Sequence, residues 1–206
     1  MKKVLCALIA LMILVCSVAM AETIAPQFTE LDTNDATYPV KFVREDIKDG
    51  VINNVHIYTM DIYDLVDISK MAVGDTFEAE GRAVTIESLE TDEYGDLNIN
   101  GGCNAENGYS LCTQEDINGW RTFLDNDLCT HTERGMLNLE MADDVTYTDI
   151  TDIQAILNGA DPLTYTGIEA VTKAIMESEN DSFYADNTEI RIVNGRIAEI
   201  TKRFVP

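Results

Sequence analysis

The chain has 206 residues, of which 37 are acidic and 14 are basic, so its formal net charge at pH 7 is −23. This excess of negative charge repels nucleic acid and anionic lipid and argues against both as partners. The apolar fraction of 46% is that of an ordinary globular protein, so the acidity does not indicate disorder.

The first 21 residues have the three parts of a secretion signal. Met1–Lys3 is cationic, Val4–Val18 is apolar apart from Ser17, and Ala19 and Ala21 occupy the two positions that signal peptidase reads. We therefore predict a bacterial protein that is cleaved after residue 21 and acts in the cell envelope or outside the cell.

Two alternatives to a cleaved signal exist. An uncleaved membrane anchor would use residues 4–21, which is near the lower limit of roughly 17–25 residues for a spanning helix. A lipoprotein would carry its lipid on Cys16, but Val15 is larger than the small residue expected before a lipidated cysteine. The small residues at the cleavage site favour cleavage, and no other segment is apolar enough to span a membrane.

The predicted mature chain has 185 residues, with 12 basic and 37 acidic side chains, because the leader contains two lysines and no acid. This length suits one medium domain or two small ones. We interpret residues 22–38 as a loose N-terminal arm and residues 39–206 as a single, mainly β domain.

Strands are predicted first at residues 39–44 and 51–60, joined as a hairpin by a turn at Lys48–Gly50. Residues 61–70 have helical spacing over a short length and predict a single-turn helix or connector. The alternation of apolar and polar residues then predicts a three-stranded antiparallel meander. Its strands are expected at 76–80, 83–90 and 96–100, with further strands at 107–114, 119–125 and 135–141.

The last third of the sequence predicts two helices and a hairpin. The helices are expected at Tyr147–Leu157 and Thr166–Glu177, and the hairpin strands at Thr188–Val193 and Arg196–Val205 flank an Asn-Gly turn. The order of elements indicates an α+β fold that is mainly antiparallel β. We expect a small meander or barrel-like sheet, with two helices before the C-terminal β-hairpin.

Three cysteines follow the leader: Cys103, Cys112 and Cys129. An odd number allows at most one internal disulfide. A Cys103–Cys112 bridge would close a short loop and stabilise the fold by roughly 2–3 kcal/mol. Cys112–Cys129 is the alternative pair, and three reduced thiols are also compatible with the sequence. The spacings lack the C-x-x-C pairs of a structural zinc site.

No complete catalytic motif is present. Cys129 and His131 are two residues apart, but a catalytic Cys/His pair is normally assembled from separate segments. We favour a structural cysteine beside an exposed histidine, and we interpret His56 as a strand residue. Paired carboxylates are so frequent in this chain that an acid/base pair cannot be located from spacing.

Two binding sites are predicted. Asp92, Glu93 and Asp96 place three carboxylates in one turn and could hold calcium, although we favour a solvated hairpin turn, because Asp and Gly are the residues that turns require. Trp120, with Tyr109 and Phe123, could form an aromatic platform for a sugar. We favour the interpretation that Trp120 is a core residue, because tryptophan is usually well buried.

Four basic residues lie close together near the end of the chain: Arg191, Arg196, Lys202 and Arg203. We interpret them as salt-bridge partners of the acidic body rather than as an anion site.

The function that the sequence favours is a non-enzymatic extracellular or cell-envelope binding module. Its ligand is expected to be a protein, a glycan or a cation, and no cofactor other than calcium is predicted. The alternatives are a secreted hydrolase that uses carboxylates, and a cell-surface structural or interaction protein. A binding module predicts an exposed apolar or aromatic patch, whereas an enzyme predicts a pocket with convergent titratable groups.

Overall fold

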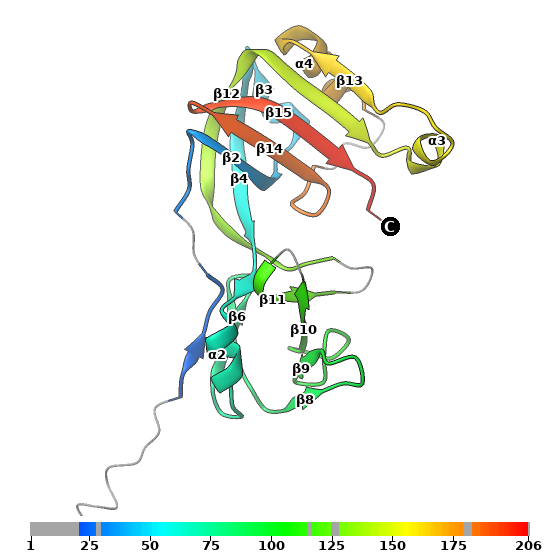
Figure 1. Cartoon of the computed structure of the whole chain (residues 1–206). Helices are drawn as coiled ribbons and strands as arrows, with labels where there is room; N and C mark the ends of the chain where they lie inside the picture. The colour runs from blue at the N-terminus through cyan, green and yellow to red at the C-terminus, as the bar shows by residue number, and fades with distance from the viewer. Residues whose placement is uncertain (1–20, 28–29, 115–116, 125–127, 179–182, 206) are drawn as a thin grey trace, which may run out of the picture.

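The computed structural model describes residues 21–27, 30–114, 117–124, 128–178 and 183–205. The predicted signal sequence lies outside these residues, apart from Ala21. The chain forms two bodies, one above the other in Figure 1, and each has a hydrophobic cluster of its own. We call the one that contains the chain's C-terminal strands the upper body and the other the lower body.

The structure is mostly β, with antiparallel and mixed sheets and a few short helices, so the predicted α+β class is confirmed. The upper body contains a seven-stranded sheet. Its strands, in spatial order, are β13 (Leu163–Thr166), β12 (His131–Ile150), β15 (Arg196–Arg203), β14 (Thr188–Val193), β2 (Asp35–Lys41), β4 (Val51–Met60) and β3 (Ile47–Lys48).

Strand β12 is 20 residues long and has different partners along its length. Its first half pairs antiparallel with β4, and its second half pairs parallel with β15 and antiparallel with β13. Register shifts at Glu133/Gly135, Leu137/Leu139 and Met141/Thr146 let one strand change direction between these partners. The pairings therefore lead from β12 through β15, β14, β2 and β4 back to β12.

The alternating sequence of these strands builds the upper core. Ile190 and Ile192 of β14 and Ile197 and Ile200 of β15 are all buried and belong to one hydrophobic cluster with residues from β2, β4 and β12. The predicted C-terminal hairpin is confirmed. Its turn uses Asn194–Gly195, with φ of 50° and 78°, which is the left-handed backbone that a tight two-residue turn demands.

Helix α4 (Ile168–Glu177) is confirmed close to its predicted position, and it buries Val171 and Ile175 against the upper core. Helix α3 (Ile153–Leu157) is shorter than predicted. Residues 147–150 were expected to begin it, but they form the end of β12 instead. They pair with strands on both sides, and these long-range hydrogen bonds outweigh a weak local preference for helix.

The lower body contains two small sheets. The first consists of β1 (Thr23–Ile24), β6 (Thr76–Ala79) and β7 (Arg82–Thr85), and the second of β5 (Ile62–Tyr63), β11 (Ile117–Phe123), β10 (Tyr109–Gln114), β9 (Leu97–Ile99) and β8 (Leu89–Thr91). Aromatic rings from three strands pack between the two sheets. The centroid of the Phe77 ring lies 4.8 Å from that of the Tyr63 ring and 5.3 Å from that of the Tyr109 ring.

The predicted three-stranded meander is divided between these two sheets. The expected strand 83–90 breaks into β7, which pairs with β6, and β8, which pairs with β9. At the break, the Asn100 Oδ1 accepts hydrogen bonds from the amides of Glu87 at 2.7 Å and Ser88 at 3.2 Å. Because a side chain satisfies these amides, the chain can leave one sheet and join the other.

Three further segments complete the fold. The expected N-terminal arm contains β1 and the first residues of β2, and β1 pairs in parallel with β6. The short 3-10 helix η1 (Arg44–Asp46) precedes β3. Helix α2 (Leu65–Lys70) falls within the predicted connector, and the Asp64 carboxylate caps it by accepting from the Val66 amide.

A buried carboxylate lies where the chain passes from the upper to the lower body. Asp61 follows β4 directly and is fully buried. Its carboxylate accepts from the Glu80 amide at 2.8 Å, the Thr130 hydroxyl at 2.8 Å and the Thr132 hydroxyl at 2.6 Å. These donors compensate for the loss of hydration and fix the lower body against the start of β12.

Among the described residues, no helix has both the length and the apolar character needed to cross a bilayer.

Candidate functional site

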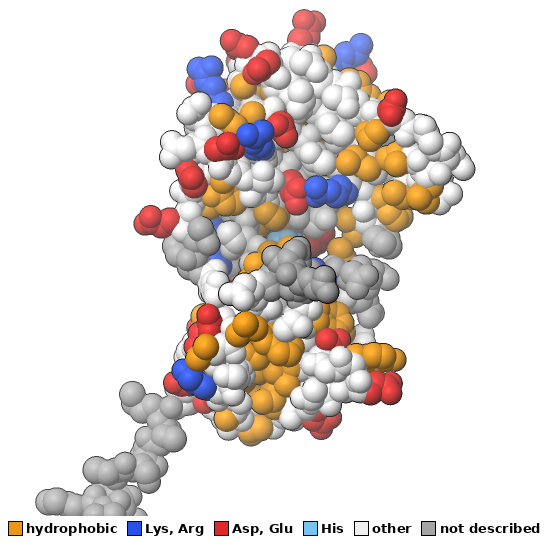
Figure 2. Space-filling model, in the orientation of Figure 1, with side chains coloured by type: hydrophobic (Ala, Val, Ile, Leu, Met, Phe, Trp, Pro, Cys, Tyr) orange, Lys and Arg blue, Asp and Glu red, His pale blue; other side chains and the backbone are white. Residues whose placement is uncertain are grey.

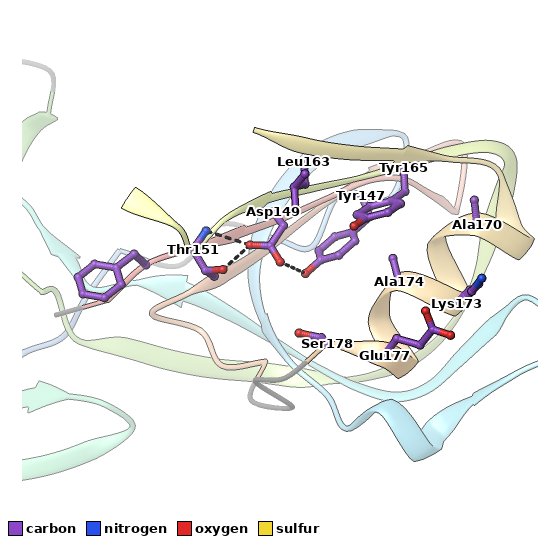
Figure 3. A pocket seen from close by; sticks show the side chains of 11 residues that line it. Tyr147, Asp149, Thr151, Leu163, Tyr165, Ala170, Lys173, Ala174, Glu177 and Ser178 are labelled. Atoms are coloured by element: carbon purple, nitrogen blue, oxygen red, sulfur yellow. Dashed lines mark hydrogen bonds between the residues drawn. The ribbon is translucent and has the colours of Figure 1, made fainter. Parts of the chain in front are cut away.

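A groove of about 780 Å³ lies in the upper body between the second half of β12, β13 and α4 (Figure 3). This volume falls within the usual range of ligand sites, roughly 300–1,000 Å³. We call it the Tyr147 groove. It is lined by Tyr147, Asp149, Thr151, Leu163, Tyr165, Ala170, Lys173, Ala174, Glu177, Ser178 and Phe204.

The groove follows from side-chain size and strand alternation. Alternate residues of β12 and β13 face it, because successive side chains of a strand point to opposite sides. Helix α4 contributes the methyl groups of Ala170 and Ala174 to the groove, together with the longer side chains of Lys173 and Glu177. The helix is held close by Val171 and Ile175, and the small alanines leave the space above it unfilled.

Two tyrosine rings form one wall of the groove. Tyr147 of β12 and Tyr165 of β13 lie opposite each other in the strand register, with ring centroids 5.9 Å apart and an interplanar angle of 17°. Tyr147 is buried, whereas Tyr165 is half-buried. The stacked pair gives the wall a fixed shape, since each ring restricts the other.

Asp149 is held in place by three donors. It accepts from the Tyr147 hydroxyl at 3.2 Å, the Thr151 amide at 2.9 Å and the Thr151 hydroxyl at 2.6 Å. Burial raises the pKa of the Tyr147 hydroxyl, and the charge of Asp149 adds to this effect. Tyr147 therefore stays protonated at neutral pH and remains a hydrogen-bond donor.

Two large apolar side chains are exposed at the rim of the groove. Leu163 is 61% exposed and Phe204 is 50% exposed, and both line the groove. Figure 2 shows apolar side chains gathered on the side of the upper body where Figure 1 places β13 and α3. Leu157, in α3, is 73% exposed. Large apolar side chains that gather at the mouth of a cavity are typical of a contact surface.

A second, smaller pocket of about 280 Å³ adjoins the groove, with which it shares Thr151 and Phe204. It also contains Tyr184, which is 48% exposed, and Asp186. The ring of Phe204 thus belongs to the walls of both spaces, and a ligand longer than the groove could extend into this pocket.

The aromatic residues singled out from the sequence lie elsewhere. Tyr109 is buried in the lower core against Phe77, and Trp120 is partly buried against the same core. Phe123 is three residues beyond Trp120 in β11, so it projects to the opposite face of the sheet. The structure does not bring the three rings together on one exposed surface.

The carboxylates of the predicted calcium site lie in the turn between β8 and β9. Asp92 closes this turn by accepting from the amides of Tyr94 at 2.9 Å and Asp96 at 3.0 Å. Burial and the neighbouring charge of Asp92 raise the pKa of Asp96. Within the described parts of the chain, no group of three or more His, Cys, Asp or Glu side chains is arranged to hold a metal ion. Calcium binding by Asp92, Glu93 and Asp96 stays a prediction.

All three described cysteines are free thiols, including the predicted pair Cys103 and Cys112. Cys112 lies opposite Arg121 in the β10–β11 ladder. The Arg121 guanidinium in turn donates to the Cys129 sulfur at 2.9 Å.

Cys129 and His131 lie near a common carboxylate, Asp186. The His131 Nδ1 is 3.4 Å from an Asp186 oxygen, and the negative charge of Asp186 also acts on the Cys129 thiol. Burial raises the pKa of Cys129, although Arg121 opposes this effect. A raised pKa keeps the thiol protonated and disfavours a nucleophilic role. The other histidine, His56, pairs with Glu133 at 2.8 Å on neighbouring strands.

The basic residues of the C-terminal hairpin are largely paired, as predicted. Arg191 contacts Asp35 and Glu199, Arg196 contacts Glu140, and Arg203 contacts Glu189. Lys202 is fully buried, whereas the three arginines are partly exposed, and its ammonium lies 4.1 Å from the centre of the Phe183 ring.

Sequence reasoning missed the groove because it placed Tyr147–Ile150 in a helix. The available signal was compositional. Residues 145–151 and 163–166 are both rich in threonine, tyrosine and β-branched residues, which favours strands.

Comparison of the chain with protein-family models, with curated proteins and with solved structures gave no match.

Proposed function

We propose that this protein is an exported, non-enzymatic binding module and that its ligand occupies the Tyr147 groove. The observation that carries the proposal is the composition of the groove. An aromatic wall, a carboxylate held by three donors and exposed apolar side chains at the rim line one concave space of about 780 Å³. Sites for small molecules and short chain segments combine these features.

The position of the groove supports this proposal. Tyr147 belongs to β12, which pairs with β13 on one side and with β15 on the other, and the floor of the groove is a helix that packs on the upper core. We take the ring of strand pairings as a small barrel-like scaffold that holds these side chains in place. A preformed site loses little conformational entropy when a ligand binds.

The charge of the chain narrows the class of ligand. Asp149 and Glu177 line the groove together with one lysine, Lys173, and the whole chain carries a net charge of −23. An anionic ligand would be repelled, so we propose a neutral or cationic one. Among the ligands that the sequence suggested, neutral glycans and basic or neutral polypeptide segments meet this condition.

The test is to fill the groove. Ala170 is exposed and lines the groove, so Ala170→Trp should block it without disturbing the core. Ala72, exposed in the lower body after α2, provides the matched control Ala72→Trp. The melting temperature of each protein is measured with neutral oligosaccharides, with random-sequence decapeptides and with calcium chloride.

A ligand present at ten times its Kd should raise the melting temperature of the wild type by about 3–5 °C. The Ala72→Trp protein should respond equally, and the Ala170→Trp protein should not respond. Equal stabilisation of all three proteins would show that the binding site lies elsewhere, and no stabilisation by any of the probes would contradict the proposal.

A hydrolase is the second candidate, because two carboxylates, Asp149 and Glu177, line the same groove. Hydrolysis of chromogenic glycosides or esters by the wild type, and its loss in Asp149→Asn, would favour this candidate over a binding module.

A further inference from the structure

β13 is an edge strand of the seven-stranded sheet. In the described part of the chain it pairs with β12 on one side and with no strand on the other. The strand consists of Leu163–Thr166 and contains neither a charged residue nor a proline. Natural edge strands are commonly protected by such residues, and an edge without them is a template for another strand.

The register identifies the main-chain groups on the open edge. The Gly167 amide donates to the Val145 carbonyl at 2.8 Å, and these two residues lie directly opposite each other when the register of β12 and β13 is continued by one residue. In an antiparallel ladder, hydrogen-bonded pairs alternate with non-bonded pairs. Tyr165 and Leu163 are therefore also bonded to β12, and the N–H and C=O groups of Thr164 and Thr166 face outward.

The side chains of the same strand face the groove. Leu163 and Tyr165 line it, and the alternation of the strand directs Thr164 and Thr166 to the other face of the sheet. A strand added to the open edge would extend this alternation. Every second side chain of the added strand would then project on the same side as Leu163 and Tyr165, beside the rim of the groove.

We propose that the ligand is an extended polypeptide segment that adds to β13 as a further strand and places an apolar side chain at the rim of the Tyr147 groove. This inference rests on the proposed function and specifies its ligand. The main-chain groups of Thr164 and Thr166 hold the segment, and the exposed Leu163 and Phe204 contact its apolar side chain.

The segment is basic, because the surroundings of β13 are acidic. Asp161 before the strand and Glu169 after it are both exposed, and Asp149 and Glu177 line the groove with a single lysine, Lys173. A second copy of this chain would bring another net charge of −23 to the same edge, so mutual repulsion disfavours self-association. A cationic partner is attracted by the same field.

The experiment selects binders and then removes one main-chain donor. The predicted mature chain is used to select decapeptides from a random display library, and the enriched peptides are titrated by fluorescence anisotropy. Two variants of the protein are compared with the wild type. Thr164→Pro removes the outward N–H, whereas Thr164→Val keeps it and changes only the side chain. Proline is tolerated on an edge strand where its nitrogen faces away from the ladder.

The expected peptides alternate apolar with other residues and carry lysine or arginine. Their affinity should fall about threefold to tenfold in Thr164→Pro and stay unchanged in Thr164→Val. A second check leaves the protein unchanged and modifies the peptide. Each peptide is N-methylated at every second amide, in two versions that together cover all amides. Only the version in which the methylated amides face β13 should lose binding. Raising the salt concentration from 0.05 to 0.5 M should also weaken binding.

Failure of this inference differs from failure of the proposed function. If Ala170→Trp abolishes peptide binding while Thr164→Pro and N-methylation have no effect, the groove binds its ligand without strand addition, and the inference is overturned. The same holds if acidic peptides are enriched, or if oligosaccharides bind and peptides do not. If Ala170→Trp has no effect on any ligand, the proposed function itself fails.

Discussion

The upper and lower bodies both bury aromatic rings, but only the upper body also places aromatic rings around the Tyr147 groove. In the lower body, the rings of Tyr63, Phe77 and Tyr109 pack together between two small sheets and are all buried. In the upper body, rings such as Phe42 and Phe183 are buried in the core, whereas Tyr165 and Phe204 remain partly exposed around an unfilled space. Aromatic content alone therefore does not locate a binding surface, because a small body needs its rings for its own core.

The strongest test of this comparison is to remove a ring from the lower core. Phe77 is fully buried between Tyr63 and Tyr109, so Phe77→Ala should lower the free energy of unfolding by about 3–5 kcal/mol. Phe77→Leu, which retains most of the volume, should cost clearly less. Denaturant unfolding measures both effects, and peptide binding to the Tyr147 groove should persist in the folded fraction.

Hydrogen exchange extends this test. If the bodies are separate folding units, Phe77→Ala should accelerate exchange in β6 and β10 and leave β14 and β15 protected. Equal acceleration in all four strands would mean that the two hydrophobic clusters unfold as one unit.

The contact between the bodies can be broken at Asp61. Asp61→Ala leaves the Glu80 amide and the Thr130 and Thr132 hydroxyls without their acceptor in a buried site. We expect the free energy of unfolding to fall by about 2–4 kcal/mol. Asp67→Ala, an exposed aspartate in α2, is the control and should cost less than about 0.5 kcal/mol. An Asp61→Ala protein as stable as the control would show that this network does not hold the two bodies together.

The smallest expected effect on stability comes from an exposed ion pair of the upper body. Hydrogen bonds from Arg191 lower the pKa of Asp35 below its ordinary value of 3.8. The stability that this carboxylate contributes is therefore present above about pH 4 and is lost as the pH falls through the lowered pKa. The melting temperatures of wild type and Asp35→Asn should differ slightly at pH 7 and converge in acid. Sodium chloride at 1 M should reduce the difference, because salt screens exposed charges. A difference that grows as the pH falls would contradict this assignment.

The sequence was sufficient to predict those elements whose structure depends on neighbouring residues. The Asn194–Gly195 turn fixes its hairpin locally, and the spacing of Val171 and Ile175 defines the buried face of α4. The sequence was not sufficient to predict those elements whose structure depends on partners distant along the chain. Tyr147 belongs to a strand because β13 and β15 both pair with its segment, and this pairing leaves no periodic signal. The candidate groove was missed for the same reason, since it requires β12, β13 and α4 together.

The pairing of β2 with β14 has a consequence for how the molecule reaches its final state. Asp35 of β2 contacts Arg191 of β14 across a sequence separation of 156 residues. Contacts between such distant segments slow the folding of a chain, because a long loop must close before they can form. During synthesis, β2 and the second half of β12 therefore have open edges until the last two strands have emerged. We expect premature termination before residue 188 to yield an aggregating product rather than a smaller folded one.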